Sequence, residues 1–152
     1  MRELEADEID EMLIRNGVGV LAMVDGAVPY AVPISFGYDV SQPIFPMQWG
    51  SGYEGRKNSV ISDNPNVCLT VYEQDVDDES VWRSVVITGE ISEIDTEDEE
   101  KAYAILAANA EFPPDFGIWG VPFEEVEFRL FGLQPDDRTG REFSTEYGGW
   151  DT

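Results

Sequence analysis

Two adjacent cations, in a chain that has few, have the clearest chemistry of any feature in the sequence. Arg56 and Lys57 directly follow the glycine-rich run Trp49-Gly-Ser-Gly-Tyr-Glu-Gly55, where we expect a short helix to begin. Free N–H groups at a helix start, the helix dipole and two cationic side chains together attract an anion, and a phosphate group suits such a site. The spacing differs from that of a Walker loop. The alternative is that the pair is exposed charge that balances an acidic surface.

Histidine is absent from the chain, and Cys68 is its only cysteine. The absence of histidine excludes a Ser-His-Asp triad, a Cys-His pair and histidine ligation of zinc or haem. Cys68 lies in the strand-like run 67–72, so we interpret it as a small buried side chain rather than a nucleophile. Carboxylates alone can bind a hard cation, but no segment has EF-hand spacing, and we predict no metal site.

The net charge is −23, from 32 acidic and 9 basic residues. The acidic residues are spread from Glu3 to Asp151, whereas a tail that binds a basic partner would gather them in one block. Repulsion of this size destabilises a compact state, and concentrated salt screens it. We therefore interpret the surface as halophilic, and the charge argues against binding to nucleic acid.

The length of 152 residues, with 42% hydrophobic residues, suits one domain, residues 1–152, with its own core. No apolar run approaches the ~18 residues that a membrane span needs, so we expect no membrane association. The first ten residues are acidic, unlike a secretory signal, and we expect a cytoplasmic protein.

The pattern of apolar residues and turn signals predicts a mainly β domain with flanking helices. Asp25-Gly26 is a strong hairpin signal between two apolar runs. The second run contains Pro29 and Pro33, which lack ladder donors, so we expect it to be irregular or at a sheet edge. Runs of antiparallel strands with few helices favour a closed sheet with the helices outside it. In chain order we expect a helix over 5–16, strands over 18–24, 28–36 and 44–48, a helix over 56–63, strands over 66–73 and 82–94, a helix over 97–108 capped by Thr96, a loop over 111–122, a strand over 125–133 and a partly flexible tail over 135–152.

Six short pieces of the chain carry a resemblance to a known family by their order and spacing. They are Gly17-Val-Gly-Val-Leu-Ala22, Pro29-Tyr-Ala-Val-Pro-Ile-Ser-Phe36, Ile44-Phe45, Glu54-Gly-Arg-Lys57, Asn64-Pro-Asn-Val-Cys68 and Ser84-Val-Val-Ile-Thr-Gly89. Over residues 4–141 the chain resembles the pyridoxamine-phosphate-oxidase-like family of FMN-binding split β-barrels. The resemblance implies that fold and a homodimer with FMN in the cleft between the subunits.

The resemblance also implies which residues contact the cofactor. It gives the FMN phosphate to Arg56 and Lys57, and it places the strand Pro33–Phe36 and the region of Ser84 beside the flavin ring. Aromatic side chains near the cleft could border that ring, with core packing as the alternative. The implied cofactor contacts are Gly55, Arg56, Lys57, Pro33, Ser35, Ser84, Trp82 and Trp119.

The chain departs from the family pattern in two ways. The region before Gly55-Arg56-Lys57 reads Met47-Gln-Trp-Gly-Ser-Gly52, where family members often have a histidine. The Arg-x-His pair with which true pyridoxamine-phosphate oxidases hold their substrate is also missing. These departures argue against a haem role and against vitamin B6 oxidation.

We therefore expect an FMN-dependent oxidoreductase that acts on a small molecule. The cofactor itself transfers the hydride, so no catalytic acid or base is required, and we predict none. The substrate is not determined by the sequence. Two alternatives remain open: a flavin-binding or ligand-binding module without turnover, and a reductase of the same fold that uses a deazaflavin.

Overall fold

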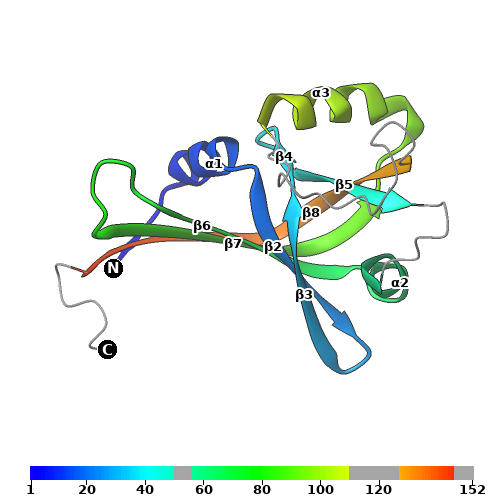
Figure 1. Ribbon diagram of the computed structural model, residues 1–152, viewed down its shortest axis with the longest axis horizontal. Coiled ribbons are helices and arrows are strands. Elements are labelled where there is room, and N and C mark those ends of the chain that lie inside the picture. Colours follow the sequence, from blue (N-terminus) through cyan, green and yellow to red (C-terminus); the bar gives the residue numbers. More distant parts are fainter. Residues whose placement is uncertain (50–55, 110–126, 146–152) are drawn as a thin grey trace, which may run out of the picture.

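The computed structural model describes residues 1–49, 56–109 and 127–145, and within these ranges the chain is mainly β (Figure 1). The helices are α1 (Ala6–Arg15), α2 (Arg56–Asp63), α3 (Glu99–Asn109) and the 3₁₀ turn η1 (Thr96–Asp98). The strands are β1 (Arg2–Glu3), β2 (Val18–Asp25), β3 (Val28–Ser35), β4 (Gly37–Tyr38), β5 (Pro43–Trp49), β6 (Asn66–Gln74), β7 (Val81–Glu93) and β8 (Glu127–Ser144). None of the helices in these ranges is long and apolar enough to cross a membrane.

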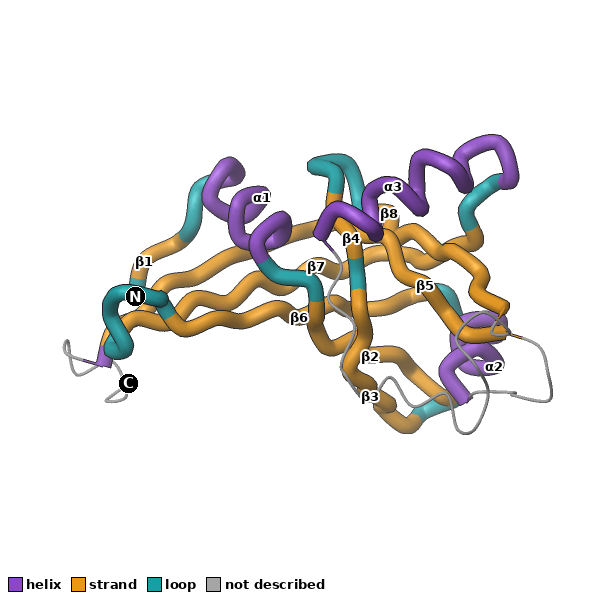
Figure 2. The backbone as a smooth tube through the Cα atoms, turned by 45° about the horizontal axis from the view of Figure 1, so that its top comes forward, coloured by secondary structure: helices purple, strands orange, loops and turns teal. Residues whose placement is uncertain are grey.

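The strands form one antiparallel sheet in the order β3-β2-β6-β7-β8-β5-β4, with β1 paired to β8. The sheet curls into a half-barrel, with the helices packed against it (Figures 1 and 2). The predicted fold class, a mainly β split barrel with flanking helices, is confirmed.

The main core lies between α1 and one face of the sheet. Alternate residues of β6 are buried there, including Leu69 and Val71, as a strand with one covered face requires. From α1, Met12 and Leu13 are fully buried at helical spacing. Burying a side chain of this size contributes about 1.5–3 kcal/mol, so these contacts fix α1 on the sheet.

Leu4 and Ile9 pack closely over Gly140 of β8. A Cβ atom at this position would lie 2.9 Å from both Ile9 Cγ1 and Leu4 Cδ1. A separate small core, made of Ile44, Ala102, Leu106 and Leu130, holds α3 against the other end of the curl. In Figure 2 α1 and α3 accordingly lie along the same side of the sheet.

The predicted β2–β3 hairpin forms, but its two turn residues are Gly26, at φ +64°, and Ala27, because Asp25 still pairs with Val28. β3 is the edge strand of the sheet, also as predicted, and its register is regular rather than irregular. The Phe36 N–H donates to the Gly17 carbonyl at 3.0 Å. Hydrogen-bonded pairs alternate with non-bonded pairs in such a ladder. Since Phe36 is in a bonded pair, Pro29 and Pro33 are in non-bonded pairs, and their backbone nitrogens face the open edge of the sheet. That edge therefore lacks two donors, which disfavours pairing with another strand.

Two boundary predictions are wrong. Thr96 does not cap the third helix: the Asp98 N–H donates to the Asp95 carbonyl at 2.9 Å, and the resulting 3₁₀ turn delays α3 to Glu99. The last strand does not end at Leu133, because β8 continues to Ser144 as the partner of the 13-residue β7. Its polar second half, assigned by the sequence to the tail, is paired there despite a bulge at Thr88/Gly89. Residues 111–122 and 146–152 lie outside the described ranges.

Candidate functional site

The sequence analysis placed an anion site at the start of a helix at Arg56, and a helix does begin at that residue. α2 starts at Arg56, so the N–H groups of its first turn lie beside the two cationic positions. Val60 and Ile61 are buried in the main core, which holds the helix in place on the sheet. Gly55 and the side chains of Arg56 and Lys57 lie outside the described residues.

Four other predicted contacts share one face of the sheet. A row of directly opposed residues runs across four strands: Pro33, Val20, Thr70 and Val86. Directly opposed residues point to the same face, and side chains alternate along each strand. Ser84 and Trp82 lie two and four residues before Val86 on β7, and Ser35 lies two residues after Pro33 on β3, so all of them point to this same face. We call this the outer face, and we call the face that packs against α1 the inner face.

The structure spreads these four residues along the outer face and does not bring them into one contact. Pro33 and Ser84 lie on strands three positions apart, which is roughly 14 Å at about 4.8 Å per strand. Ser84 and Trp82 are half-buried, Pro33 is exposed, and Ser35 is only 2% exposed. Contacts spread in this way suit an extended planar ligand rather than a small ion. Trp119 lies outside the described residues.

Tyr72 is a candidate contact that the sequence analysis missed. It lies directly opposite Ser84, and its ring centroid is 6.4 Å from that of Trp82 with an interplanar angle of 31°. Tyr72 is 65% exposed, so this aromatic pair can offer a surface to a planar ring. The alternation of buried residues in β6 signals which face Tyr72 occupies, but only the register places it beside Trp82.

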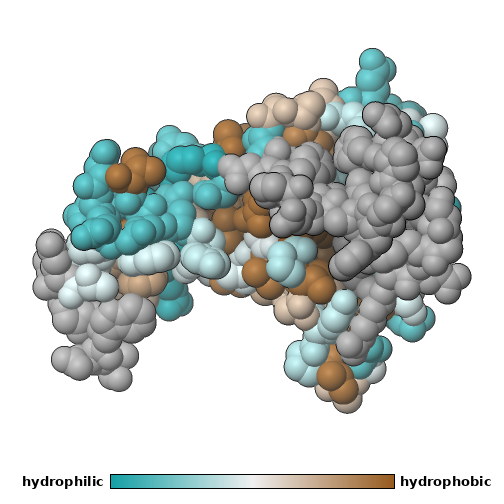
Figure 3. Space-filling model, viewed as in Figure 1, coloured by the Kyte–Doolittle hydropathy of each residue, from teal (hydrophilic) through white to brown (hydrophobic). Residues whose placement is uncertain are grey.

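The centre of the outer face is largely apolar. Its half-buried residues include Val18, Val20, Ala22, Cys68, Thr70 and Val86. Cys68 was expected to be a small buried side chain, but it lies on this face of β6 and is only half-buried. At the hairpin, Val24 and Val28 are 39% and 56% exposed. In Figure 3 apolar surface gathers in the centre and at the hairpin, whereas the end that carries α1 is hydrophilic.

The inner face has a contrasting cluster of charges around Arg83. Its guanidinium donates three hydrogen bonds: from Nε to Glu142 at 2.9 Å, from Nη1 to Glu73 at 2.9 Å and from Nη2 to Asp75 at 2.6 Å. These bonds raise the pKa of Arg83. Hydrogen bonds from Arg83 lower the pKa of Asp75. Burial raises the pKa of Glu73, but hydrogen bonds from Arg15, Asn16 and Arg83 outweigh it and the net direction is down.

The Arg83 cluster connects α1 and β1 to three strands. Arg15 of α1 donates to Glu73 at 2.7 Å, and Arg2 of β1 donates to Glu8 at 2.8 Å and to Glu142 at 3.3 Å. A groove of about 560 Å³ runs over these groups. Each guanidinium along it already has carboxylate partners, so the groove is best explained as a structural network.

A second, partly buried network joins the middle of α1 to β4 and β8. The Tyr38 hydroxyl donates to Asp10 at 2.6 Å and accepts from Arg138 at 2.7 Å, and Arg138 also bonds Asp10. Burial, followed by the bond to Asp10, raises the pKa of Tyr38. Burial pushes the pKa of Asp10 up, but the bonds from Arg138 and Tyr38 hold it below its usual value. The group has no unsatisfied member with which to bind a ligand.

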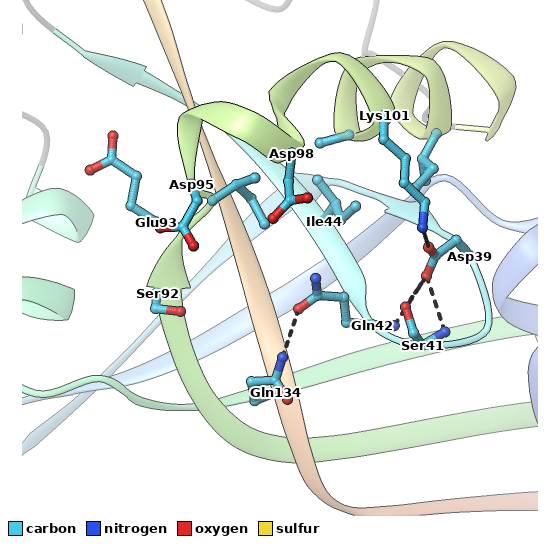
Figure 4. Close-up of a pocket in the computed structure, with 13 residues that line it drawn as sticks. Asp39, Ser41, Gln42, Ile44, Ser92, Glu93, Asp95, Asp98, Lys101 and Gln134 are labelled. Carbon is cyan, nitrogen blue, oxygen red and sulfur yellow. Dashed lines mark hydrogen bonds and ion pairs between the residues drawn. The ribbon is translucent and has the colours of Figure 1, made fainter.

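A pocket of about 340 Å³ lies between the start of α3 and the turn after β4 (Figure 4). Asp39 accepts from the Ser41 N–H at 3.0 Å and lies 3.9 Å from Lys101 Nζ. Gln134 donates to Gln42 at 3.3 Å across the floor. The neighbouring carboxylates of Asp95, Glu97 and Asp98 lie within 4.8 Å of one another and are exposed. Exposed acidic groups of this kind are expected on a chain with 32 acidic residues.

Solved structures with the same fold include flavin and haem proteins. A FAD-binding protein from Mesorhizobium loti has a TM-score of 0.73 and 24% identity, over 94% of this chain and 98% of that one. The FAD binding protein from Mycobacterium smegmatis has a TM-score of 0.68 and 19% identity, over 95% and 99%. A heme binding protein from the same organism has a TM-score of 0.67 and 13% identity, over 96% of this chain and 60% of that one.

The family itself is shown by sequence. A comparison with curated proteins found no match. The model of the pyridoxamine 5'-phosphate oxidase family matches residues 5–142, nearly the whole span over which the six short pieces suggested the resemblance. Over that span lie the inner-face core, the start of α2 and the outer face. The chain therefore belongs to the pyridoxamine 5'-phosphate oxidase family.

Proposed function

We propose that this protein binds FMN, with the phosphate at the start of α2 and the ring along the outer face. One observation carries the proposal: in a chain of this flavin-binding family, α2 begins at Arg56, so helix N–H groups and two cations coincide. The half-buried apolar outer face fits a planar ring. Structural neighbours named for FAD support a flavin in general, and the choice of FMN rests on the resemblance.

The reaction that we propose is oxidation or reduction of a small molecule. A bound flavin supplies hydride transfer. The residues of the chain would bind and orient the cofactor and keep water from one side of its ring, and none is proposed as a catalytic acid or base. A chain without histidine is not proposed to bind haem or to oxidise vitamin B6. Catalysed oxidation of a reduced nicotinamide would separate an enzyme from a module without turnover, and the absorbance spectrum would separate a flavin from a deazaflavin.

We also propose that two copies associate through the outer face and that the protein is cytoplasmic. Half-buried valines on a broad sheet face favour association. The edge of β3 disfavours the alternative of edge-to-edge pairing, because two donors are missing at Pro29 and Pro33. A flavin would then lie in a cleft shared by both copies. Light scattering in high salt should return twice the 17.0 kDa chain mass, and a monomer mass would contradict both the dimer and the shared cleft.

The test of the cofactor site is fluorescence titration of the variant Arg56→Ala/Lys57→Ala with FMN and with riboflavin. Charge-assisted bonds to phosphate contribute about 1.5–3 kcal/mol each, so FMN binding should weaken by about 3–5 kcal/mol, with the lower end expected in high salt. Riboflavin has no phosphate and should bind the parent and the variant equally weakly.

The matched control is Lys101→Ala/Arg129→Ala, which removes the same charge from α3 and β8 instead of from the start of α2. Both control side chains are substantially exposed, at 77% and 40%. FMN affinity should be nearly unchanged in the control. An unchanged affinity in folded Arg56→Ala/Lys57→Ala would show that the pair is only surface charge.

A further inference from the structure

One cation differs from all the other described cations. Six basic residues each have a carboxylate within 4.0 Å: Arg2, Arg15, Arg83, Lys101, Arg129 and Arg138. Arg141 is exposed and, among the basic residues whose side chains the structure describes (which leaves out Arg56 and Lys57), it is the one whose side chain has no ion pair or hydrogen bond. Glu3 lies directly opposite it on β1, yet no ion pair joins them. In a chain with 32 acidic residues, an unpaired guanidinium is the exception.

The register places Arg141 on the outer face beside the aromatic pair. Arg141 of β8 lies directly opposite Ser84 of β7, and Ser84 lies opposite Tyr72 of β6. Side chains directly opposed on neighbouring strands have Cβ atoms about 5 Å apart. Arg141 and Tyr72 are therefore roughly 10 Å apart across Ser84, a gap that a planar ligand can bridge. Trp82 borders the same gap through its contact with Tyr72.

These groups complement one kind of ligand. The guanidinium is a rigid fork of donors that pairs with a carboxylate or phosphate through two hydrogen bonds. The Tyr72 and Trp82 rings offer a surface for stacking, and Ser84 contributes a hydroxyl between them. We propose that Arg141, Ser84 and the Tyr72–Trp82 pair form a subsite for a planar ring that carries an anionic group. The proposal deepens the proposed function, on which its assignment to a flavin site rests.

Two sources could supply this chemistry. The first is the adenylate half of FAD, if the protein uses the longer flavin. The second is a separate aromatic carboxylate that serves as substrate. Both require Arg141 to contact the anion, and they differ in whether FAD binds more tightly than FMN.

The experiment is calorimetric titration of the purified protein with two charged probes and their neutral counterparts. The pairs are AMP with adenosine, and benzoate with benzamide. One charged probe should bind the parent at least about tenfold more tightly than its neutral counterpart, because a bond to a charged group contributes about that factor or more. Arg141→Gln should abolish the difference, and Arg141→Lys should retain only part of it. Arg129→Gln removes the same charge from a residue paired with Glu93 and should leave the difference intact.

The outcomes separate the sources and the proposals. A preference for FAD over FMN that Arg141→Gln removes identifies the adenylate half, whereas benzoate binding to FMN-loaded protein identifies a substrate. Equal binding of charged and neutral probes to the parent overturns the subsite. The subsite is also overturned if Arg141→Gln and Arg129→Gln change the affinity difference between charged and neutral probes equally, or if Arg141→Gln changes only the mass of the dimer. If the protein binds no flavin but still discriminates between charged and neutral probes, the proposed function fails and the subsite stands.

Discussion

The inner and outer faces of the same sheet differ in how far one chain buries their apolar side chains and pairs their charges. Along β7, Val85 and Ile87 point to the inner face and are at most 1% exposed, under the cover of α1. Their neighbours Ser84 and Val86 point to the outer face and are half-buried. The inner face pairs Arg83 with three carboxylates, whereas the outer face leaves Arg141 without a partner among the described residues.

This difference separates a scaffold from a binding surface. Groups that are buried and paired within one chain stabilise the fold and have nothing left to offer a ligand. Apolar residues and a cation that one chain leaves open favour a ligand or a second copy. We therefore expect substitutions on the inner face to change stability, and substitutions on the outer face to change binding.

We expect the largest effect from removing salt. Dialysis to dilute buffer tests whether the ion pairs of the inner face can hold the fold by themselves. At low ionic strength those pairs become stronger, but so does the repulsion within a net charge of −23. We expect the repulsion to dominate and the protein to unfold on dialysis from molar to dilute salt. Circular dichroism measures this. Full retention of structure and of melting temperature in dilute buffer would contradict the halophilic interpretation.

A pair of adjacent residues in β6 sharpens the comparison. Leu69 is 0% exposed on the inner face, and Leu69→Ala should destabilise the fold by about 2–5 kcal/mol through a cavity. Thr70, its neighbour on the outer face, is half-buried, and Thr70→Ala should cost less than about 1 kcal/mol. Urea unfolding of both variants in high salt provides the measurement. Similar costs at the two positions would show that the outer face is as fully packed as the inner one.

The smallest of these effects concerns the Arg83 cluster and its dependence on pH. Glu73 and Asp75 have lowered pKa values in the fold, so their contribution is present above their unfolded values of 4.5 and 3.8 and is lost as the pH falls through the lowered values. Arg83→Gln removes one partner of each, while Glu73 keeps its bonds from Arg15 and Asn16, and should cost about 1–2 kcal/mol near pH 7, after allowance for solvent screening.

As the pH falls through the lowered pKa values the carboxylates become protonated, and the difference in stability between parent and Arg83→Gln should shrink. Thermal unfolding of both proteins across pH 3–7 follows this. A gap of constant size across the range would mean that Arg83 acts through packing of its stem rather than through its charge. Arg141→Gln is the outer-face control and should change the melting temperature little at any pH.

Local elements could be predicted because their signals are local. α1 follows from the spacing of its apolar residues, the hairpin from Asp25-Gly26, and the start of α2 from its position after the glycine-rich run. The edge position of β3 followed from two prolines. The full length of β8 could not be predicted in this way, because its second half is polar and becomes a strand only through pairing with β7.

The sequence by itself determined the family, the alternation that assigns each strand residue to a face, and the scarcity of cations that makes each one informative. The tertiary structure alone decided which residues meet across strands. Register depends on contacts between segments far apart in the chain, and no local pattern encodes it. Tyr72, Ser84 and Arg141 form one row only because β6, β7 and β8 are aligned as they are. The same alignment decides that Arg83 finds its carboxylates on the inner face, while Arg141 on the outer face finds none among the described residues.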